Sequence, residues 1–309
     1  MAFLRHVADI ELPPHAKPGG FDHATVHARR RRLYVAHTAN DAIDVIDCAT
    51  NTYLHSVPHL VGVAGALVAE DHDLVFTSNR GENTVAIFPA DREEALVRVT
   101  VGMRPNGLAY DASRRLLLAA NVGDPSQSAS VTVSLVDVGA QALIGDLPVP
   151  GRTRWTVFDV ETGSFYVNIA DPPQIVVIEA AHPGRVARAF PVPAAGPHGL
   201  DLDAATRRLF CACDGKTLVV LDCRSGDVLA QAELAGVPDV IFFNRDRQHL
   251  YVAIGDPGLI EVFETGRMRH VETVRTEPGA HTLGFDPIGH TVYAFLPGTH
   301  RAAVYADGG

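Results

Sequence analysis

Cysteine is scarce in this sequence, and long apolar runs are absent from it. Four cysteines among 309 residues do not make a disulfide framework. No apolar run approaches the roughly 18–20 residues that a membrane-spanning helix needs. The first nine residues lack the apolar core of a signal peptide and already carry charge at Arg5 and Asp9. These absences predict a cytoplasmic protein that has no membrane partner.

The sequence also has fewer basic residues than acidic ones. Lysine and arginine together number 26 against 36 aspartates and glutamates, which gives a formal net charge of −10 at pH 7. Nucleic acids and anionic lipid surfaces repel such a chain, so we expect no nucleic-acid partner. The basic cluster Arg29–Arg32 is short, and we interpret it as a solvated turn.

What the sequence has instead is an internal repeat. One segment recurs seven times, at separations of roughly 41 to 48 residues, which is the period of a four-stranded propeller blade. Each copy has a short apolar stretch, a polar turn and then a run similar to Leu-Tyr-Val-Ala, as in Gly20–Val26 followed by Leu33–His37. A third and a fourth strand follow in each copy, with the period-2 alternation and Gly, Asp, Asn and Pro punctuation of strands and turns.

The seventh copy stops after its third strand, and a surplus strand, Arg5–Leu12, precedes the first copy. This strand completes the seventh blade in our interpretation, because a ring left open would expose unpaired strand edges. The sequence therefore predicts an all-β fold, a seven-bladed β-propeller of four-stranded antiparallel blades with a ring closed by the N-terminal strand. Residues 1–309 are expected to form one domain.

The second strands of the repeats resemble those of the YVTN-type seven-bladed propellers, which are named for a Tyr-Val-Thr-Asn run. The corresponding runs in this chain are Tyr34-Val-Ala-His, Phe76-Thr-Ser-Asn, Leu118-Ala-Ala-Asn and Tyr251-Val-Ala-Ile. The resemblance covers essentially the whole chain and implies the propeller fold. Because these propellers include both enzymes and binding scaffolds, it leaves the function open.

Two rings of residues are predicted at one mouth of the central channel. The innermost strand of a blade runs antiparallel to the second strand, so the start of the first and the end of the second share a rim. The equivalent positions at the start of the first strands form an inner ring: His23, Gly65, Asn106, Arg154, His198, Asp239 and His281. The ends of the second strands form a companion ring: His37, Asn79, Asn121, Ile169, Cys213, Ile254 and Leu296.

The inner ring carries a candidate metal site. Four consecutive blades supply His198, Asp239, His281 and His23. Imidazoles with a carboxylate suit a divalent ion such as Zn, Mn, Fe or Ni, and His37 and Cys213 of the companion ring are possible additions to it. The alternative is structural, since histidines at these positions also bond backbone carbonyls or hold channel waters.

A narrower resemblance follows from the strand starts Pro197-His-Gly-Leu and Ala280-His-Thr-Leu. They are similar to those of virginiamycin B lyase, a seven-bladed propeller with a magnesium-assisted site. The resemblance implies that His198 and His281 act as general base or metal ligands, with Asp239 in place of that enzyme's channel glutamate. Lactone-hydrolysing propellers such as gluconolactonase are a second enzyme model, which Asn106 and Asp239 match in part.

We therefore expect a metal-assisted enzyme of lyase or lactonase type that acts on a small polar molecule at the channel mouth. Its predicted catalytic residues are His198, His281, Arg154 and Asn106, and its predicted metal ligands are His23, His198, Asp239 and His281. Arg154 and Asn106 would orient an anionic or carbonyl group of the substrate. Trp155 is expected either at the wall of the mouth or between blades. The alternative function is a non-catalytic scaffold that binds a protein or peptide at its rim.

Overall fold

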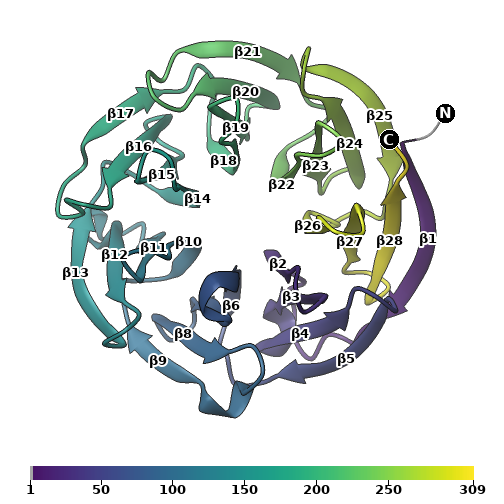
Figure 1. The fold of residues 1–309 in the computed structure, drawn as a ribbon, viewed down its shortest axis with the longest axis horizontal. Coiled ribbons are helices and arrows are strands. Elements are labelled where there is room, and N and C mark those ends of the chain that lie inside the picture. Colours follow the sequence, from purple (N-terminus) through teal and green to yellow (C-terminus); the bar gives the residue numbers. More distant parts are fainter. Residues whose placement is uncertain (1–2) are drawn as a thin grey trace.

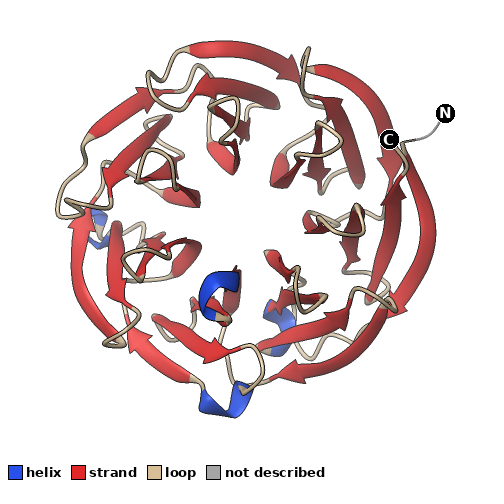
Figure 2. Cartoon of the chain, viewed as in Figure 1, coloured by secondary structure: helices blue, strands red, loops and turns tan. Residues whose placement is uncertain are grey.

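Seven four-stranded sheets stand around a central channel in the computed structural model of this protein, which describes residues 3–309 (Figure 1). All neighbouring strands in a sheet are antiparallel, and strands make up nearly all of the regular structure (Figure 2). The helical segments are single 3₁₀ turns: η1 (Thr38–Asn40), η2 (Glu70–His72), η3 (Glu93–Ala95) and η4 (Ser128–Ser130). The predicted all-β, seven-bladed β-propeller is confirmed.

Blades 1 to 6 each use four consecutive strands, which follow one another from the channel outward. Blade 1 has β2 (Ala24–His27), β3 (Arg32–His37), β4 (Ala42–Asp47) and β5 (Thr52–Val57). Blade 2 has β6 (Val63–Ala69), β7 (Leu74–Asn79), β8 (Thr84–Pro89) and β9 (Val97–Thr100). Blade 3 has β10 (Pro105–Asp111), β11 (Leu116–Asn121), β12 (Thr132–Asp137) and β13 (Ala142–Pro148).

The second half of the ring repeats this order. Blade 4 has β14 (Thr153–Asp159), β15 (Ser164–Ile169), β16 (Gln174–Glu179) and β17 (Arg188–Pro191). Blade 5 has β18 (Pro197–Asp203), β19 (Arg208–Cys213), β20 (Thr217–Asp222) and β21 (Val228–Glu233). Blade 6 has β22 (Pro238–Asn244), β23 (His249–Ile254), β24 (Leu259–Glu264) and β25 (Arg269–Arg275).

Blade 7 joins the two ends of the chain. Its inner strands are β26 (Thr282–Asp286), β27 (Thr291–Leu296) and β28 (Arg301–Asp307), and its outermost strand is β1 (Leu4–Glu11). β1 pairs antiparallel with β28 and lies beside it at the rim in Figure 1. The N-terminal strand therefore closes the ring, as predicted.

The turn between the first two strands repeats one backbone device around the ring. In every blade the residue before the second strand has a left-handed conformation, with φ between +46° and +62°. The seven residues are Arg31, Asp73, Arg115, Gly163, Arg207, Gln248 and His290. This conformation suits a tight hairpin connection, and the repetition places the starts of all the innermost strands at one end of the channel.

The hydrophobic core consists of layers between neighbouring blades. Leu4 packs in the layer between blades 6 and 7, while Ile10 packs in the layer between blades 7 and 1. The closing strand β1 is thus held by apolar contacts on both sides as well as by its hydrogen bonds. No helix among residues 3–309 has the length and apolar character needed to cross a membrane.

Candidate functional site

The inner-ring side chains meet at one mouth of the channel. They surround a cavity of about 200 Å³, which we call the basin. The basin is lined by His23, Asn106, Arg154, His198, Asp239 and His281, all predicted, and by Asp22, Arg80, Arg104, Val122 and Arg152. The structure thus brings every predicted catalytic and metal-ligating residue into one cavity.

A β-bulge at the start of the innermost strand presents these side chains. In blade 5, Pro197 pairs with Cys213 and Gly199 pairs with Ala212, so that His198 is an extra residue on β18. The same register shift follows the first residue of β6, β10, β14 and β22. A bulge re-aims the side chain of the extra residue, and here it does so at the channel mouth.

The bulge corrects the predicted ring in blade 2. Val63 pairs with Asn79 and Gly65 pairs with Ser78, so the extra residue is Ala64 and the predicted Gly65 is one position too far. A Cβ atom on Gly65 would lie 2.3 Å from the carbonyl oxygen of Asn106. Glycine is therefore needed for the close approach of two inner strands.

His198 is held by charged groups on both ring nitrogens. Its Nδ1 lies 2.7 Å from Asp214 Oδ1, and its Nε2 lies 3.1 Å from Asp239 Oδ1. Arg154 contacts the same group, with Nη1 3.2 Å from His198 Nε2 and Nη2 3.1 Å from Asp214 Oδ2. Burial lowers the pKa of His198, but Asp239 and Asp214 outweigh burial and raise that pKa to about 9. His198 is therefore an imidazolium at neutral pH.

His281 forms an aspartate–histidine pair whose outer nitrogen is free. Its Nδ1 lies 2.8 Å from Asp239 Oδ2, its side chain is 37% exposed, and its Nε2 has no partner among residues 3–309. Burial opposes protonation of His281, but Asp239 outweighs burial and raises the pKa. The pKa of Asp239 lies well below its usual range, because His198 and His281 outweigh the burial that would raise it. The arrangement fixes the proton on Nδ1 and leaves Nε2 for chemistry.

A second network crosses the other side of the basin. Asp22 Oδ1 lies 2.6 Å from His23 Nδ1, and Asp22 Oδ2 lies 3.4 Å from Arg80 Nη2. Arg80 Nη2 also donates to Asn106 Oδ1 at 2.6 Å. The imidazole of His23 stacks on the indole of Trp155 at 3.7 Å with an interplanar angle of 1°. Trp155 therefore forms a wall of the channel under the basin.

The donor set does not fit a divalent metal in this arrangement. Both nitrogens of His198 face carboxylates, so this side chain has no lone pair left for a metal, and four arginines line the same basin. Among residues 3–309, no group of three or more His, Cys, Asp or Glu side chains is placed to hold a metal ion. Among the predicted metal ligands, His198 and His281 contact Asp239, while His23 contacts Asp22.

The prediction that the companion ring faces the mouth is wrong. His37, Asn79, Asn121 and Cys213 are fully buried inside their blades, so neither His37 nor Cys213 joins the basin. Because successive side chains of a strand point to opposite faces, the residue one position further on faces the mouth. Arg80 follows Asn79 and Val122 follows Asn121, and both line the basin. Asp214 follows Cys213 and contacts His198.

His37 belongs to a separate histidine cluster under the segment that links β1 to β2. Its Nδ1 lies 2.7 Å from Asp44 Oδ2. The ring of His15 lies 5.0 Å from that of His37 and 4.3 Å from that of His300, between centroids. Burial lowers the pKa of His15, and the charges of His37 and His300 lower it further.

Arg104 and Arg152 are the functional candidates that the sequence reasoning missed. Both are exposed residues that line the basin, and neither side chain forms an ion pair or hydrogen bond within residues 3–309. Burial lowers the pKa of Arg152, and the charges of Arg154 and Arg104 lower it further. Arg104 lies two residues before Asn106, and Arg152 lies two residues before Arg154. This shared spacing from the inner ring is the sequence pattern that could have identified them.

The basin is electropositive in a protein of negative net charge. Four arginines and three histidines line it against two aspartates, Asp22 and Asp239, while the whole chain has a formal charge of −10. A cleft lined by one sign of charge concentrates ligands of the opposite sign. The arrangement therefore attracts small anions into the mouth of the channel.

The fold defines the protein as a seven-bladed β-propeller, and comparison with solved structures agrees. A chain of Kuenenia stuttgartiensis hydrazine synthase superposes with a TM-score of 0.82 at 13% identity, covering 96% of this chain and 97% of that one. A chain of the mitotic checkpoint complex superposes with a TM-score of 0.81 at 9% identity, covering 97% and 91%. At these identities the similarity establishes the fold alone.

No family model matches the sequence, and no curated protein does. The predicted membership of the YVTN-type propellers and the resemblance to virginiamycin B lyase therefore stay predictions. One of the two similar structures is named as an enzyme and the other as a protein complex, so the function has to be argued from the site.

Proposed function

We propose that the basin binds a small organic anion of the carboxylate class and that the protein acts on it as a lyase or lactone-opening enzyme. The observation that carries this proposal is the pair of unpaired arginines, Arg104 and Arg152, at a cavity of about 200 Å³. That volume lies below the roughly 300–1,000 Å³ of sites for drug-sized ligands, so the ligand is a compact molecule.

The other basin residues support binding by holding their charges in place. Arg80 is fixed by Asn106 and Asp22, and Arg154 is fixed by Asp214. These contacts partly neutralise Arg80 and Arg154, whereas the guanidinium groups of Arg104 and Arg152 remain available. A guanidinium fork matches the geometry of a carboxylate, and such charge-assisted pairs are roughly twice as strong as neutral hydrogen bonds.

His281 is the candidate proton donor. Because its pKa is raised, the imidazolium form persists above pH 6.5, and Nε2 presents a proton to the basin. That proton passes to the leaving oxygen of the bound anion as its C–O bond breaks and the electron pair stays on that oxygen, while Asp239 keeps the ring oriented through Nδ1. In an elimination the neighbouring C–H proton goes to solvent water as the double bond forms, and in a lactone opening a water molecule adds to the acyl carbon and releases its proton to solvent.

The metal-assisted form of the reaction stays a prediction from the sequence. The side chains of the basin are not arranged as metal ligands, and the proton transfer from His281 does not require a metal. Metal analysis of the purified protein tests it directly. Stoichiometric transition metal in the wild type that is lost in a His198→Ala/His281→Ala variant would support the metal-assisted reaction.

The alternative of a protein-binding rim finds no specific support. The large apolar side chains that are exposed lie on several blades, singly as at Leu54 and Ile288 or as neighbouring pairs as at Leu143–Ile144 and Val228–Leu229. Scattered residues of this kind are ordinary for a protein surface. Binding of a protein or peptide at the rim therefore stays a prediction that no apolar surface patch supports.

Calorimetric titration with malonate at low ionic strength tests the proposal. We expect the double variant Arg104→Gln/Arg152→Gln to bind malonate at least about tenfold more weakly, because each lost charge-assisted contact contributes roughly 1.5–3 kcal/mol. Arg245→Gln is the matched control, since Arg245 is also exposed and without an ion pair but lies at the other mouth. Equal malonate affinity in all three proteins would refute the proposed function.

A further inference from the structure

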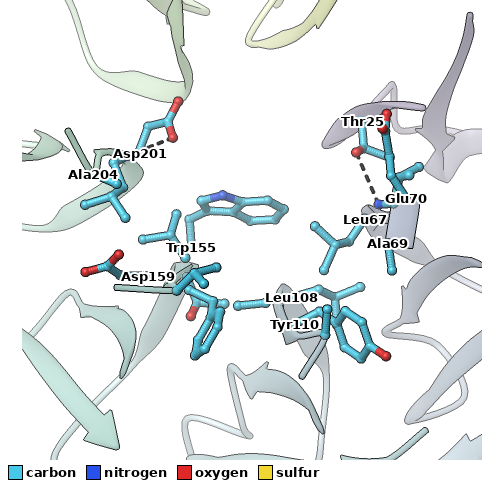
Figure 3. A pocket seen from close by; sticks show the side chains of 18 of the residues that line it. Thr25, Leu67, Ala69, Glu70, Leu108, Tyr110, Trp155, Asp159, Asp201 and Ala204 are labelled. Atoms are coloured by element: carbon cyan, nitrogen blue, oxygen red, sulfur yellow. Dashed lines mark hydrogen bonds between the residues drawn. The ribbon is translucent and has the colours of Figure 1, made fainter. Parts of the chain in front are cut away.

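A second and larger cavity lies in the channel on the far side of Trp155. Its volume is about 640 Å³, and we call it the chamber (Figure 3). Apolar side chains from the innermost strands form most of its wall, among them Leu67, Leu108, Trp155, Val157 and Phe242. This volume and lining are typical of small-molecule sites, which occupy about 300–1,000 Å³.

The chamber and the basin are separate compartments. Arg154 lines the basin, while the next residue of β14, Trp155, projects into the chamber, as Figure 3 shows. The stacked pair of His23 and Trp155 stands between them. The gap beside this pair, bordered also by Gly199 and Phe242, has a volume of only about 10 Å³, which is at the lower limit for holding one water molecule and too small for an organic ligand.

The two compartments carry opposite charge. Five carboxylate residues line the chamber against one guanidinium, that of Arg245: they are Glu70, Asp71, Asp159, Glu161 and Asp201. Asp71 and Glu161 are exposed and form no ion pair among residues 3–309. The channel therefore has an electropositive end at the basin and an electronegative end at the chamber.

Asp201 places a carboxyl group at the wall of the chamber. Its two oxygens accept hydrogen bonds from the backbone N–H groups of Leu202 and Phe243, both at 2.7 Å. Burial raises the pKa of Asp201 to about 6, which is less than the full effect because those N–H groups favour the charged form. A cation bound nearby would stabilise the ionised carboxylate further.

We infer that the chamber is a second binding site, for a small organic cation that has an aromatic or branched apolar body, such as an arylalkylammonium ion. The apolar wall supplies the driving force for burying the body of such a ligand. The indole face of Trp155 attracts a cationic group, and the carboxylates select a cation over an anion of the same shape. This site is independent of the proposed anion site and stands or falls separately from it.

Fluorescence provides the test, because Trp155 is the sole tryptophan of the chain and its indole forms part of the chamber wall. We expect benzyltrimethylammonium to shift or quench its emission with saturation. Benzoate has the ring with the opposite charge, and tetramethylammonium has the charge without the ring. Both are expected to bind at least tenfold more weakly at this site, and calorimetry checks each affinity.

A pair of variants at Leu67 assigns the binding to the chamber. Leu67→Arg adds a cation to the wall and is expected to abolish the benzyltrimethylammonium response, while the uncharged Leu67→Gln retains it within about tenfold. A far-ultraviolet circular dichroism spectrum like that of the wild type, with a cooperative urea transition, shows that the ring is folded in both variants. The inference is overturned if benzyltrimethylammonium produces no saturable response in the wild type, or if Leu67→Arg binds it as tightly as Leu67→Gln does.

Discussion

At the scale of single residues, the basin depends on carboxylates that each serve a histidine. Asp22 holds His23, Asp214 holds His198, and Asp239 lies between His198 and His281. These pairs fix ring orientation and keep positive charge at the mouth. The contacts of His198 make the stability of the protein depend on pH in a direction that can be stated.

His198 is expected to stabilise the fold most below pH 6.5. Its folded pKa of about 9 lies above the value of about 6.5 in the unfolded chain. Its contribution is therefore complete below pH 6.5 and is lost as the pH rises through 9. We expect Asp214→Asn to lower the pKa of His198 by about one unit, as measured by NMR titration of the histidine Hε1 signals.

Asp71→Asn is the control for this change, because it removes the same charge at the opposite mouth. We expect Asp71→Asn to leave the pKa of His198 unchanged. A pKa of His198 near 6.5 in the wild type would contradict the described network, and so would the same pKa of His198 in the wild type and in Asp214→Asn.

His15 is expected to act in the opposite direction. Its folded pKa lies below the unfolded value, so the unfolded chain binds the proton first and stability is lost as the pH falls below 6.5. We expect His15→Gln to lose less unfolding free energy than the wild type between pH 7 and pH 5, measured by urea denaturation. An identical loss in both proteins would show that His15 is not the group that titrates.

At the scale of the strand, the bulge decides which side chains reach the channel. The repeat period locates the innermost strands and places six of seven ring positions, because hydrophobic alternation and turn residues are local signals. The bulge is not visible in that pattern, so the repeat predicts Gly65 where the structure has Ala64. The predicted companion ring lies one residue too early, and with a period of two this error puts Asn79 at the mouth in place of Arg80.

Gly199 is the residue at which this strand geometry can be tested. A Cβ atom there would lie 2.2 Å from the carbonyl oxygen of Asp239 on the next blade. We expect Gly199→Ala to cost about 1–3 kcal/mol of unfolding free energy and to weaken malonate binding through Asp239. Gly145→Ala is the control, because a Cβ atom at Gly145 has no neighbour within 4 Å; urea denaturation compares the two. Equal stability of the two variants would contradict the close approach.

At the scale of the whole molecule, closure of the ring joins residues that are far apart in sequence. β1 completes the last blade, and His281 of blade 7 and His23 of blade 1 consequently line one basin. The sequence predicted this convergence from seven equal repeats. It did not predict the charge balance of the channel, because Arg104, Arg152 and the chamber carboxylates stand outside the ring positions that the repeat defines.

The most direct test of the central claim is a crystal structure of the protein grown or soaked with malonate. We expect density for one malonate in the basin, with a carboxylate within about 2.7–3.2 Å of a guanidinium nitrogen of Arg104 or Arg152. An empty basin at a malonate concentration that saturates calorimetric binding, or malonate bound only on the outer surface of the blades, would contradict the account.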